Sequence, residues 1–232
     1  MYSCGASHLK ISVIIPTLNE ETCLGETLAH LRGLNPHEII VADGGSTDST
    51  LTLAQDADHV VNGPRGRAAQ MNGGAAHATG DALLFLHADC LLESGALRSI
   101  EKILPRRSRV AGCFRMKVQA TGFLYRMIDL CATARVGLTG IIYGDQGLFL
   151  TRKVWDDVGG FPEVRFMEDV QISLKLRTLG RVVVSPQHIY VSPRRWQRSG
   201  IIRQTLRNWT LTGLAACGIH PDKLAQFYPL IR

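Results

Sequence analysis

Short apolar runs alternate with helix-like patterns through the first part of the chain. Each run is followed by polar or glycine residues, and then by apolar residues three or four positions apart, which is the spacing of one helix face. We expect strands at residues 11–15, 39–42, 60–61 and 82–86, and helices at residues 20–34, 48–54 and 66–78. Such alternation predicts an α/β fold, with a mostly parallel sheet covered by helices on both faces.

The pattern is less regular after residue 90. Helices are expected at residues 92–104, 123–136 and from about 168 to 179, with strands at 110–118 and 147–150; two short strands at 182–184 and 189–191 flank a proline-containing turn, and a long amphipathic helix covers about 199–217. No repeat, low-complexity segment or break in composition marks a linker. We therefore predict one α/β domain over residues 1–196 and a helical C-terminal extension, residues 197–232, packed on it.

Length and composition fit one large globular domain, because 232 residues with 45% hydrophobic content can bury a substantial core. The six cysteines include no CxxC pair and no histidine spacing of a zinc site, which also argues against a disulfide framework. No secretory segment and no apolar run long enough to span a membrane is found. We expect a cytoplasmic protein with reduced thiols.

The positive charge is concentrated in one stretch. The formal net charge is +6, and residues 170–221 contain no Asp or Glu. Arg198, Arg203 and Arg207 lie there beside Leu206 and Trp209, so the last helix could rest on an anionic bilayer at the inner face of the membrane. The same face could instead bind a soluble phosphorylated acceptor, pack against a second subunit as a homodimer or reach the diphosphate of a bound donor, and the sequence leaves these alternatives open.

Polar residues follow the first two predicted strands, at the sheet edge where open α/β sheets bind ligands. The carboxylate of Asp43 could accept a hydrogen bond from a base or a ribose hydroxyl, and Gly44 lets a ligand approach the backbone. The competing interpretations are a helix cap at Thr17 or Asn19 and a turn-stabilising aspartate. The candidate donor-binding residues at this edge are Pro16, Thr17, Asn19, Glu20, Asp43 and Gly44.

Further candidates follow the strand at residues 82–86 and begin the third helix. Asp89 ends the segment His87-Ala88-Asp89 and suits a hard divalent cation, which would neutralise the charge that develops on a departing diphosphate. A capping aspartate is the alternative. Arg67, at the helix N-terminus, could contact phosphate oxygens, or form an ordinary surface salt bridge.

Glu168 and Asp169 begin a predicted helix after a glycine- and proline-containing loop. A carboxylate there could deprotonate an acceptor hydroxyl as it attacks an anomeric carbon, which would invert the configuration. The alternative is an acidic pair that favours the helix dipole. The turn Gly144-Asp145-Gln146 could line the acceptor pocket, although a plain turn is also consistent with it.

Together these segments resemble family 2 glycosyltransferases with the GT-A (Rossmann-like) fold, from Ile11 to about Trp196. The motifs that carry the resemblance are Val13-Ile14-Ile15-Pro16-Thr17-Leu18-Asn19-Glu20-Glu21, Asp43-Gly44-Gly45-Ser46-Thr47-Asp48, Gly66-Arg67 with Asn72, Leu86-His87-Ala88-Asp89, and Glu168-Asp169.

The resemblance implies a UDP- or GDP-sugar bound by the N-terminal half, with Mn²⁺ or Mg²⁺ on Asp89 and Asp169 as catalytic base. It also places Asn72, His87 and Ala88 on the donor side. Arg195-Trp196 looks like the tail of the family's RW motif, on the acceptor or diphosphate side. No nucleic acid partner is expected.

His87 departs from the family pattern, because it stands at the first position of the DxD motif. The change removes a negative charge, although imidazole can still bind a metal or a ribose. With the turn at residues 144–146 and the tail ending in Phe227-Tyr228-Pro229, the chain resembles a bacterial subgroup often labelled arsenosugar-biosynthesis glycosyltransferases.

We therefore predict an inverting, metal-assisted glycosyltransferase with an unknown acceptor. A lipid-phosphate glycosyltransferase at the membrane surface and a non-catalytic nucleotide-sugar-binding module are the alternatives. A nucleotidylyltransferase is disfavoured, because no glycine-rich loop with a phosphate-gripping lysine follows the first strand.

Overall fold

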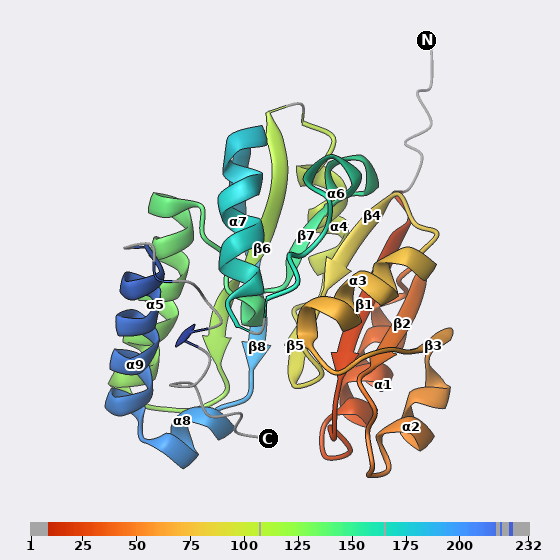
Figure 1. Ribbon diagram of the computed structural model, residues 1–232, viewed down its shortest axis with the longest axis horizontal. Coiled ribbons are helices and arrows are strands. Elements are labelled where there is room, and N and C mark those ends of the chain that lie inside the picture. The colour runs from red at the N-terminus through yellow and green to blue at the C-terminus, as the bar shows by residue number, and fades with distance from the viewer. Residues whose placement is uncertain (1–8, 107, 165, 217–218, 220–222, 225–232) are drawn as a thin grey trace.

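The computed structural model describes residues 9–106, 108–164, 166–216, 219 and 223–224, which form one eight-stranded sheet flanked by helices (Figure 1). The strand order is β3-β2-β1-β4-β7-β6-β8-β5. The strands are β1 (Ile11–Thr17), β2 (Glu38–Asp43), β3 (His59–Asn62), β4 (Ala82–Phe85), β5 (Cys90–Leu92), β6 (Arg109–Val118), β7 (Leu148–Thr151) and β8 (Arg181–Val191). The predicted α/β architecture is confirmed.

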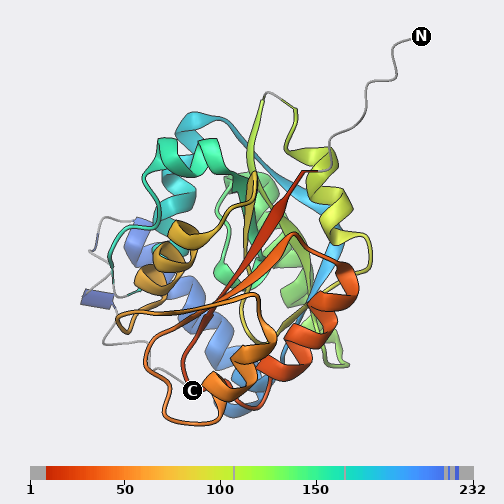
Figure 2. The same cartoon turned by 90° about the vertical axis from the view of Figure 1, so that its right-hand side faces the viewer.

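Helices cover both faces of this sheet. They are α1 (Leu24–Leu34), α2 (Thr50–Leu53), α3 (Arg67–His77), α4 (Ala96–Ile103), α5 (Phe123–Thr139), α6 (Arg152–Val158), α7 (Glu168–Leu179), α8 (Arg194–Ser199) and α9 (Ile201–Ala216), with short 3₁₀ turns η1 (Ala54–Asp56) and η2 (Gly144–Gln146). Figure 2 shows α1 and α3 on opposite sides of β1. Within the described residues, no helix is long and apolar enough to cross a membrane.

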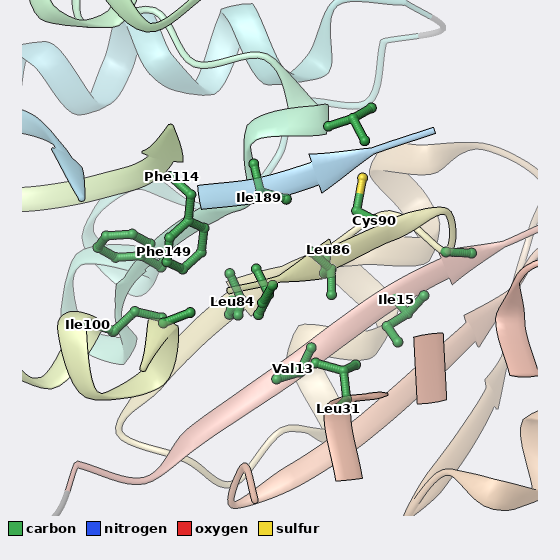
Figure 3. Packing of buried hydrophobic residues seen from close by; sticks show 14 of the residues in the cluster. Val13, Ile15, Leu31, Leu84, Leu86, Cys90, Ile100, Phe114, Phe149 and Ile189 are labelled. Carbon is green, nitrogen blue, oxygen red and sulfur yellow. The ribbon is translucent and has the colours of Figure 1, made fainter. Parts of the chain in front are cut away.

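The first four strands are parallel and carry the core. β1 pairs with β2 and β4, and β2 pairs with β3. Successive side chains of a strand point to opposite faces, so Val13 packs with Leu84 and with Leu31 of α1 (Figure 3). Ile14 belongs to the cluster on the other face, together with Met71 of α3. Burial on both faces explains why these strands appear in the sequence as unbroken apolar runs.

The second half of the sheet mixes directions. β7 is antiparallel to both β4 and β6, β5 is antiparallel to β8, and β6 is parallel to β8. The prediction of two strands at residues 182–184 and 189–191 was wrong, because one strand spans both. The register shifts between Cys113, opposite Val184, and Arg115, opposite His188, and this irregularity accommodates Pro186, which cannot donate a backbone hydrogen bond.

Other boundaries also differ from the predictions. Residues 90–92 form strand β5, and the following helix begins only at Ala96. The helix predicted at residues 199–217 is divided into α8 and α9 at Gly200, whose φ of 80° is unfavourable for other residues. Helix α6 was not predicted; the hydroxyl of Thr151 caps it by accepting a hydrogen bond from Val154 N–H. The tail segment Phe227-Tyr228-Pro229 lies outside the described residues.

We predict that Gly112→Ala destabilises the protein by about 1–3 kcal/mol, because overpacking forces neighbouring atoms apart. A Cβ at this position of β6 would lie 2.5 Å from a Phe149 ring carbon and 2.9 Å from the carbonyl oxygen of Val183. Urea unfolding measures the effect. Gly137→Ala is the matched control: its Cβ meets no atom within 4 Å, so helix propensity should make it neutral or stabilising by up to about 1 kcal/mol. Equal midpoints for the two variants would contradict the packing argument.

Candidate active site

A small pocket brings together residues that are far apart in the sequence. Its volume is about 60 Å³, and it lies where the loop after β4, the turn η2 and the start of α7 meet. Its lining residues are Arg67, His87, Tyr143, Gly144, Asp145, Phe166, Met167, Asp169, Val170, Arg195, Asn208 and Thr212. Six of these residues were predicted site residues: Arg67, His87, Gly144, Asp145, Asp169 and Arg195.

Asp169 is held in the first turn of α7 by two backbone donors. Its Oδ2 accepts a hydrogen bond from Gly144 N–H at 2.7 Å, and its Oδ1 accepts one from Val170 N–H at 2.7 Å. A Cβ at Gly144 would lie 2.7 Å from His87 Nε2 and 3.5 Å from Asp169 Oδ2. His87 and Asp169 therefore flank the same glycine, and only glycine fits between them without displacement.

Glu168 is differently placed from its neighbour. Its side chain is buried, and Oε1 pairs with Arg67 Nε at 2.8 Å. Burial raises the pKa of Glu168, and the charge of Arg67 opposes this rise. Glu168 thus positions Arg67, and of the two predicted catalytic carboxylates it is Asp169 that lines the pocket.

Asp145 is half-buried, and one oxygen of its carboxylate, Oδ1, is fully buried. Among the described residues, this oxygen has no hydrogen-bond partner. Burial raises the pKa of Asp145; the charges of Arg195 and Arg135 lower it, and those of Asp169 and Asp89 raise it further. A buried oxygen without a partner is uncommon in proteins and suggests a position that a ligand completes.

The third residue of the same turn, Gln146, is structural. It is fully buried, its Oε1 accepts a hydrogen bond from Arg135 Nη2, and its Nε2 donates to Ala132 O at 3.4 Å. The guanidinium of Arg135 also stacks on the ring of Tyr143, 3.3 Å from the centroid, and Tyr143 shares a hydrogen bond with Thr212 of α9. Arg135 and Tyr143 were missed in the sequence analysis, because no motif marks them.

The loops after β1 and β2 form the predicted donor side. Asp43 is buried, and its carboxylate accepts hydrogen bonds from Thr17 Oγ1 (3.0 Å), Gly45 N–H (2.8 Å), Ser46 N–H (2.7 Å) and Ser46 Oγ. These bonds fix the turn, which was the competing interpretation of this aspartate. Asn19 Oδ1 accepts from Thr47 N–H at 2.9 Å and so ties the two loops together. Any contact of Asp43 with a donor remains a prediction.

Several other predicted donor-side residues lie in structural positions. Asn72 bonds the backbone of Phe161 with both halves of its amide, at 2.9 and 3.0 Å, and so holds the loop before α7. Pro16 is buried in β1, and Ala88 is buried, with its carbonyl accepting a hydrogen bond from Thr27 Oγ1. Gln70, which was not predicted, donates to the carbonyls of Thr17 and Ala42, and a Cβ at Gly44 would clash with it.

Asp89, the predicted metal ligand, is part of an ion-paired cluster. Its Oδ2 lies 3.1 Å from Arg194 Nη2, which also lies 3.3 Å from Glu20 Oε2. Burial lowers the pKa of Arg194, but the hydrogen bond and charge of Asp89, with smaller effects of Cys23 and Glu20, raise it overall. Arg194 therefore stays a cation, and it is a site residue that the motif analysis missed.

The residues near Asp89 do not fit a divalent ion as they are placed. The carboxylate is already ion-paired with Arg194, and His87 lies beside Gly144 and Asp169. Across the described part of the chain, no three His, Cys, Asp or Glu side chains gather as ligands for a metal. The four described cysteines, Cys23, Cys90, Cys113 and Cys131, are free thiols.

A larger apolar cavity adjoins the pocket. It has a volume of about 460 Å³ and lies between α5 and α9, which run side by side in Figure 1. Tyr143, Asp145, Asn208 and Thr212 line both spaces, so the two share a wall. Away from that wall the lining is mostly apolar and includes Met116, Ile128, Ala132, Ile141, Trp196 and Trp209. The predicted residue Trp196 thus belongs to this cavity.

Comparison with known proteins identifies sugar transferases. The chain is 29% identical over 155 residues to an undecaprenyl-phosphate 4-deoxy-4-formamido-L-arabinose transferase of Sodalis glossinidius, a match that covers 61% of this chain and 48% of the relative. It is 23% identical over 225 residues to the O-antigen chain rhamnosyltransferase RfbN of Salmonella typhimurium, covering 82% and 70%. The chain spans about half the length of the first of these relatives.

Solved structures share the fold at low sequence identity. The mannosyltransferase PcManGT from Pyrobaculum calidifontis, in complex with GDP-Man and Mn²⁺, matches with a TM-score of 0.63 and 22% identity, covering 79% of this chain and 56% of that one. A TarS fragment from S. aureus in complex with UDP-GlcNAc matches with a TM-score of 0.60 and 21% identity, covering 79% and 58%. These matches confirm the GT-A fold that the resemblance implied.

A protein-family model matches the N-terminal part of the chain, which supplies several segments of the pocket. Residues 12–165 match the model of Glycosyl transferase family 2, which is more than half of the chain. The matched region includes the loops after β1, β2 and β4 and the turn η2, as the motif analysis expected. The chain belongs to glycosyl transferase family 2.

Proposed function

We propose that this protein transfers a sugar from a nucleoside-diphosphate donor to an acceptor hydroxyl, with inversion at the anomeric carbon. The observation that carries the proposal is the convergence of Asp169, Asp145, His87, Arg67 and Arg195 on one pocket. Family membership supports it, as do the GDP-Man and UDP-GlcNAc bound to proteins of the same fold. Thermal-shift screening of UDP- and GDP-sugars would identify the base and the sugar of the donor.

Asp169 is the proposed catalytic base. The acceptor hydroxyl loses its proton to this carboxylate as the oxygen attacks the anomeric carbon, and the bond from that carbon to the diphosphate breaks with the electron pair leaving on the diphosphate. The hydrogen bonds from Gly144 and Val170 N–H fix the carboxylate before the substrate arrives. A preorganised base of this kind pays no reorganisation cost during the reaction.

The cations of the pocket are proposed to offset the charge that develops on the leaving group. Arg67 is held by the buried Glu168, so its position is set by the protein rather than by the ligand. Arg195 lines the same pocket, and its charge lowers the pKa of Asp145. The divalent ion that the resemblance implied, Mn²⁺ or Mg²⁺, enters no step here, because Asp89, the residue predicted to hold it, is ion-paired with Arg194.

Asp145 is proposed to bind the acceptor. Its Oδ1 is buried and, within the described part of the chain, has no hydrogen-bond partner; the residue lines the same pocket as Asp169. A hydroxyl of the acceptor could donate to this oxygen and supply the missing hydrogen bond, which would orient a neighbouring hydroxyl toward Asp169. The free protein would then bear the cost of the unsatisfied carboxylate until substrate binds.

A second candidate function is transfer to a lipid phosphate at a membrane surface. Large apolar side chains are exposed on α5 and α9, the two helices that also line the apolar cavity; they are Phe123, Leu124, Met127, Leu130, Leu138, Ile202, Leu206, Trp209 and Leu214. Helix α9 contains no acidic residue, and Arg203 and Arg207 lie on it. An amphipathic basic helix of this composition is typical of proteins that rest on anionic bilayers. The Sodalis relative is named for a lipid phosphate, undecaprenyl phosphate.

Replacing the base tests the first proposal. We expect Asp169→Asn to lower the rate of transfer by about 10²–10⁴-fold, the usual contribution of a general base, with donor affinity little changed. Release of nucleoside diphosphate with acceptor present measures the rate, and calorimetry measures donor binding. Asp157→Asn, at an exposed pair with Lys153, is the matched control. Turnover near that of the control would remove Asp169 from the mechanism.

Asp145→Asn should stabilise the free protein more at about pH 8 than at about pH 4. The pKa of Asp145 is raised in the folded protein, so the folded state binds the proton more tightly than the unfolded state does. The wild-type protein therefore loses stability as the pH rises above the unfolded-state pKa of this carboxyl. Asparagine does not ionise, so the variant avoids this loss. Thermal unfolding of both proteins across this pH range measures the difference. A gain that does not change with pH would show that the carboxylate carries no such cost.

Membrane contact is tested by co-sedimentation with liposomes. Wild-type protein should bind vesicles of phosphatidylcholine with phosphatidylglycerol, and the double variant Leu206→Gln with Trp209→Gln should bind roughly tenfold more weakly, because apolar burial in the interface is lost. Leu174→Gln, at an exposed position of α7, is the control. Binding that does not rise with the fraction of anionic lipid would contradict the proposal. If the wild type is a dimer in solution and the double variant is a monomer, this surface would instead be assigned to a second subunit.

A further inference from the structure

Arg194 lies at the carboxyl edge of the parallel strands, outside the residues that line the pocket. We propose that its guanidinium binds the diphosphate of the donor, so that nucleoside-diphosphate binding does not depend on a divalent ion. This inference rests on the proposed donor class. It starts from the disagreement between the predicted metal site at Asp89 and the ion pair that the structure shows there.

The backbone fixes Arg194 in this position. Strand β5 pairs with β8, with Cys90 opposite Val191, and Ser192 N–H donates to Asp89 O at 3.3 Å. The chain therefore passes Asp89 immediately before it reaches Arg194. The guanidinium then reaches across to the loop after β1, where Nη1 donates to Thr22 Oγ1 at 3.2 Å and Nη2 to Glu20 Oε2 at 3.3 Å. One side chain thus joins three segments of the ligand-binding edge.

The charges of this cluster favour a fixed cation. Glu20 and Asp89 supply two carboxylates to one guanidinium, and His87, at the first position of the motif, adds no fixed negative charge. Mg²⁺ and Ca²⁺ prefer several oxygen ligands, and such an ion would first have to displace Arg194 from Asp89. A guanidinium held by two carboxylates is already present at this point, without a requirement for metal.

The geometry of Arg194 leaves it able to take a diphosphate. A guanidinium has five N–H donors in a planar fork, and the three hydrogen bonds to Thr22, Glu20 and Asp89 leave others. The side chain is 40% exposed, so a ligand can reach it. Arginine forks match phosphate oxygens in pairs, and these charge-assisted bonds are stronger than neutral ones. Glu20 and Asp89 act as positioning residues that hold the fork at the sheet edge.

Arg67 provides a contrast within the same site. Its Nε pairs with Glu168, whose side chain is only 3% exposed, whereas the carboxylates that hold Arg194 are 23% and 27% exposed. Ion pairs that water reaches are weak and can rearrange on ligand binding, but breaking a buried pair is costly. Of these two cations, Arg194 is the more exposed, at 40% against 28%, and its ion pairs can adjust as a diphosphate binds to its remaining N–H donors.

Calorimetric titration of UDP and GDP into EDTA-treated protein tests the proposal. Wild type should bind one of them in EDTA, with a Kd within a few-fold of that in Mn²⁺. Arg194→Ala should weaken binding in EDTA by roughly tenfold or more, the loss expected for a charged hydrogen bond, and Arg194→Lys should recover part of it. Arg32→Ala, which removes an exposed arginine from its pair with Asp58, is the control and should not change the Kd.

Asp89→Asn provides a second variant, whose result does not depend on the folding of Arg194→Ala. If the guanidinium binds the diphosphate, this variant should bind in EDTA more weakly than wild type but more tightly than Arg194→Ala, because Glu20 still holds the guanidinium. Wild-type binding that appears only with Mn²⁺ and disappears in Asp89→Asn would overturn the inference and leave the proposed function standing. Failure of wild type to bind either nucleotide, with or without Mn²⁺, would overturn the donor class and this inference together.

Discussion

The candidate site depends on one hydrogen bond, which Gly144 N–H donates to Asp169 Oδ2 over 2.7 Å. It joins the turn before β7 to the first turn of α7, and no other bond described between these two segments reaches the proposed base. Because β7 is antiparallel to β4, this turn lies at the same end of the sheet as the loop that carries His87. Any side chain at this junction would displace the His87 ring, so glycine lets the two segments approach without rearrangement. The antiparallel strand therefore brings the acceptor side to the donor side.

Local sequence predicted the parallel half of the fold well, for a physical reason. Strands β1, β2 and β4 are buried on both faces, so their apolar runs are unbroken and their carboxyl ends mark a ligand edge. Strand β5 and the continuity of β8 were not predictable in this way. β5 has three residues and forms only because β8 passes beside it, and the irregularity around Pro186 depends on pairing with β6. Long-range pairing of this kind leaves little trace in local periodicity.

The same distinction holds for the site. Asp169, Asp145 and His87 could be found because each sits in a motif or a turn, and the structure brings them together. The ion-pair partners of the charged side chains could not be predicted from the sequence, although these partners determine which charges are available to a ligand. Glu168 and Asp169 are adjacent in sequence, yet one is buried against Arg67 and the other faces the pocket. Arg194 could be found only from contacts that cross the sheet edge, because its partners Glu20 and Asp89 lie far away in the chain.

Electrostatic crowding gives a reason for the histidine at position 87. Asp145 already feels the charges of Asp169 and Asp89, and both raise its pKa. The His87 ring lies beside Gly144, next to Asp169, so an aspartate there would add another carboxylate to a partly buried cluster. Like charges in such a space make ionisation costly, which would work against a base that must be ionised before it can accept a proton. A histidine at this position fills the same space without that repulsion. With one carboxylate fewer to hold a divalent ion, the proposed cation at the donor side is the guanidinium of Arg194.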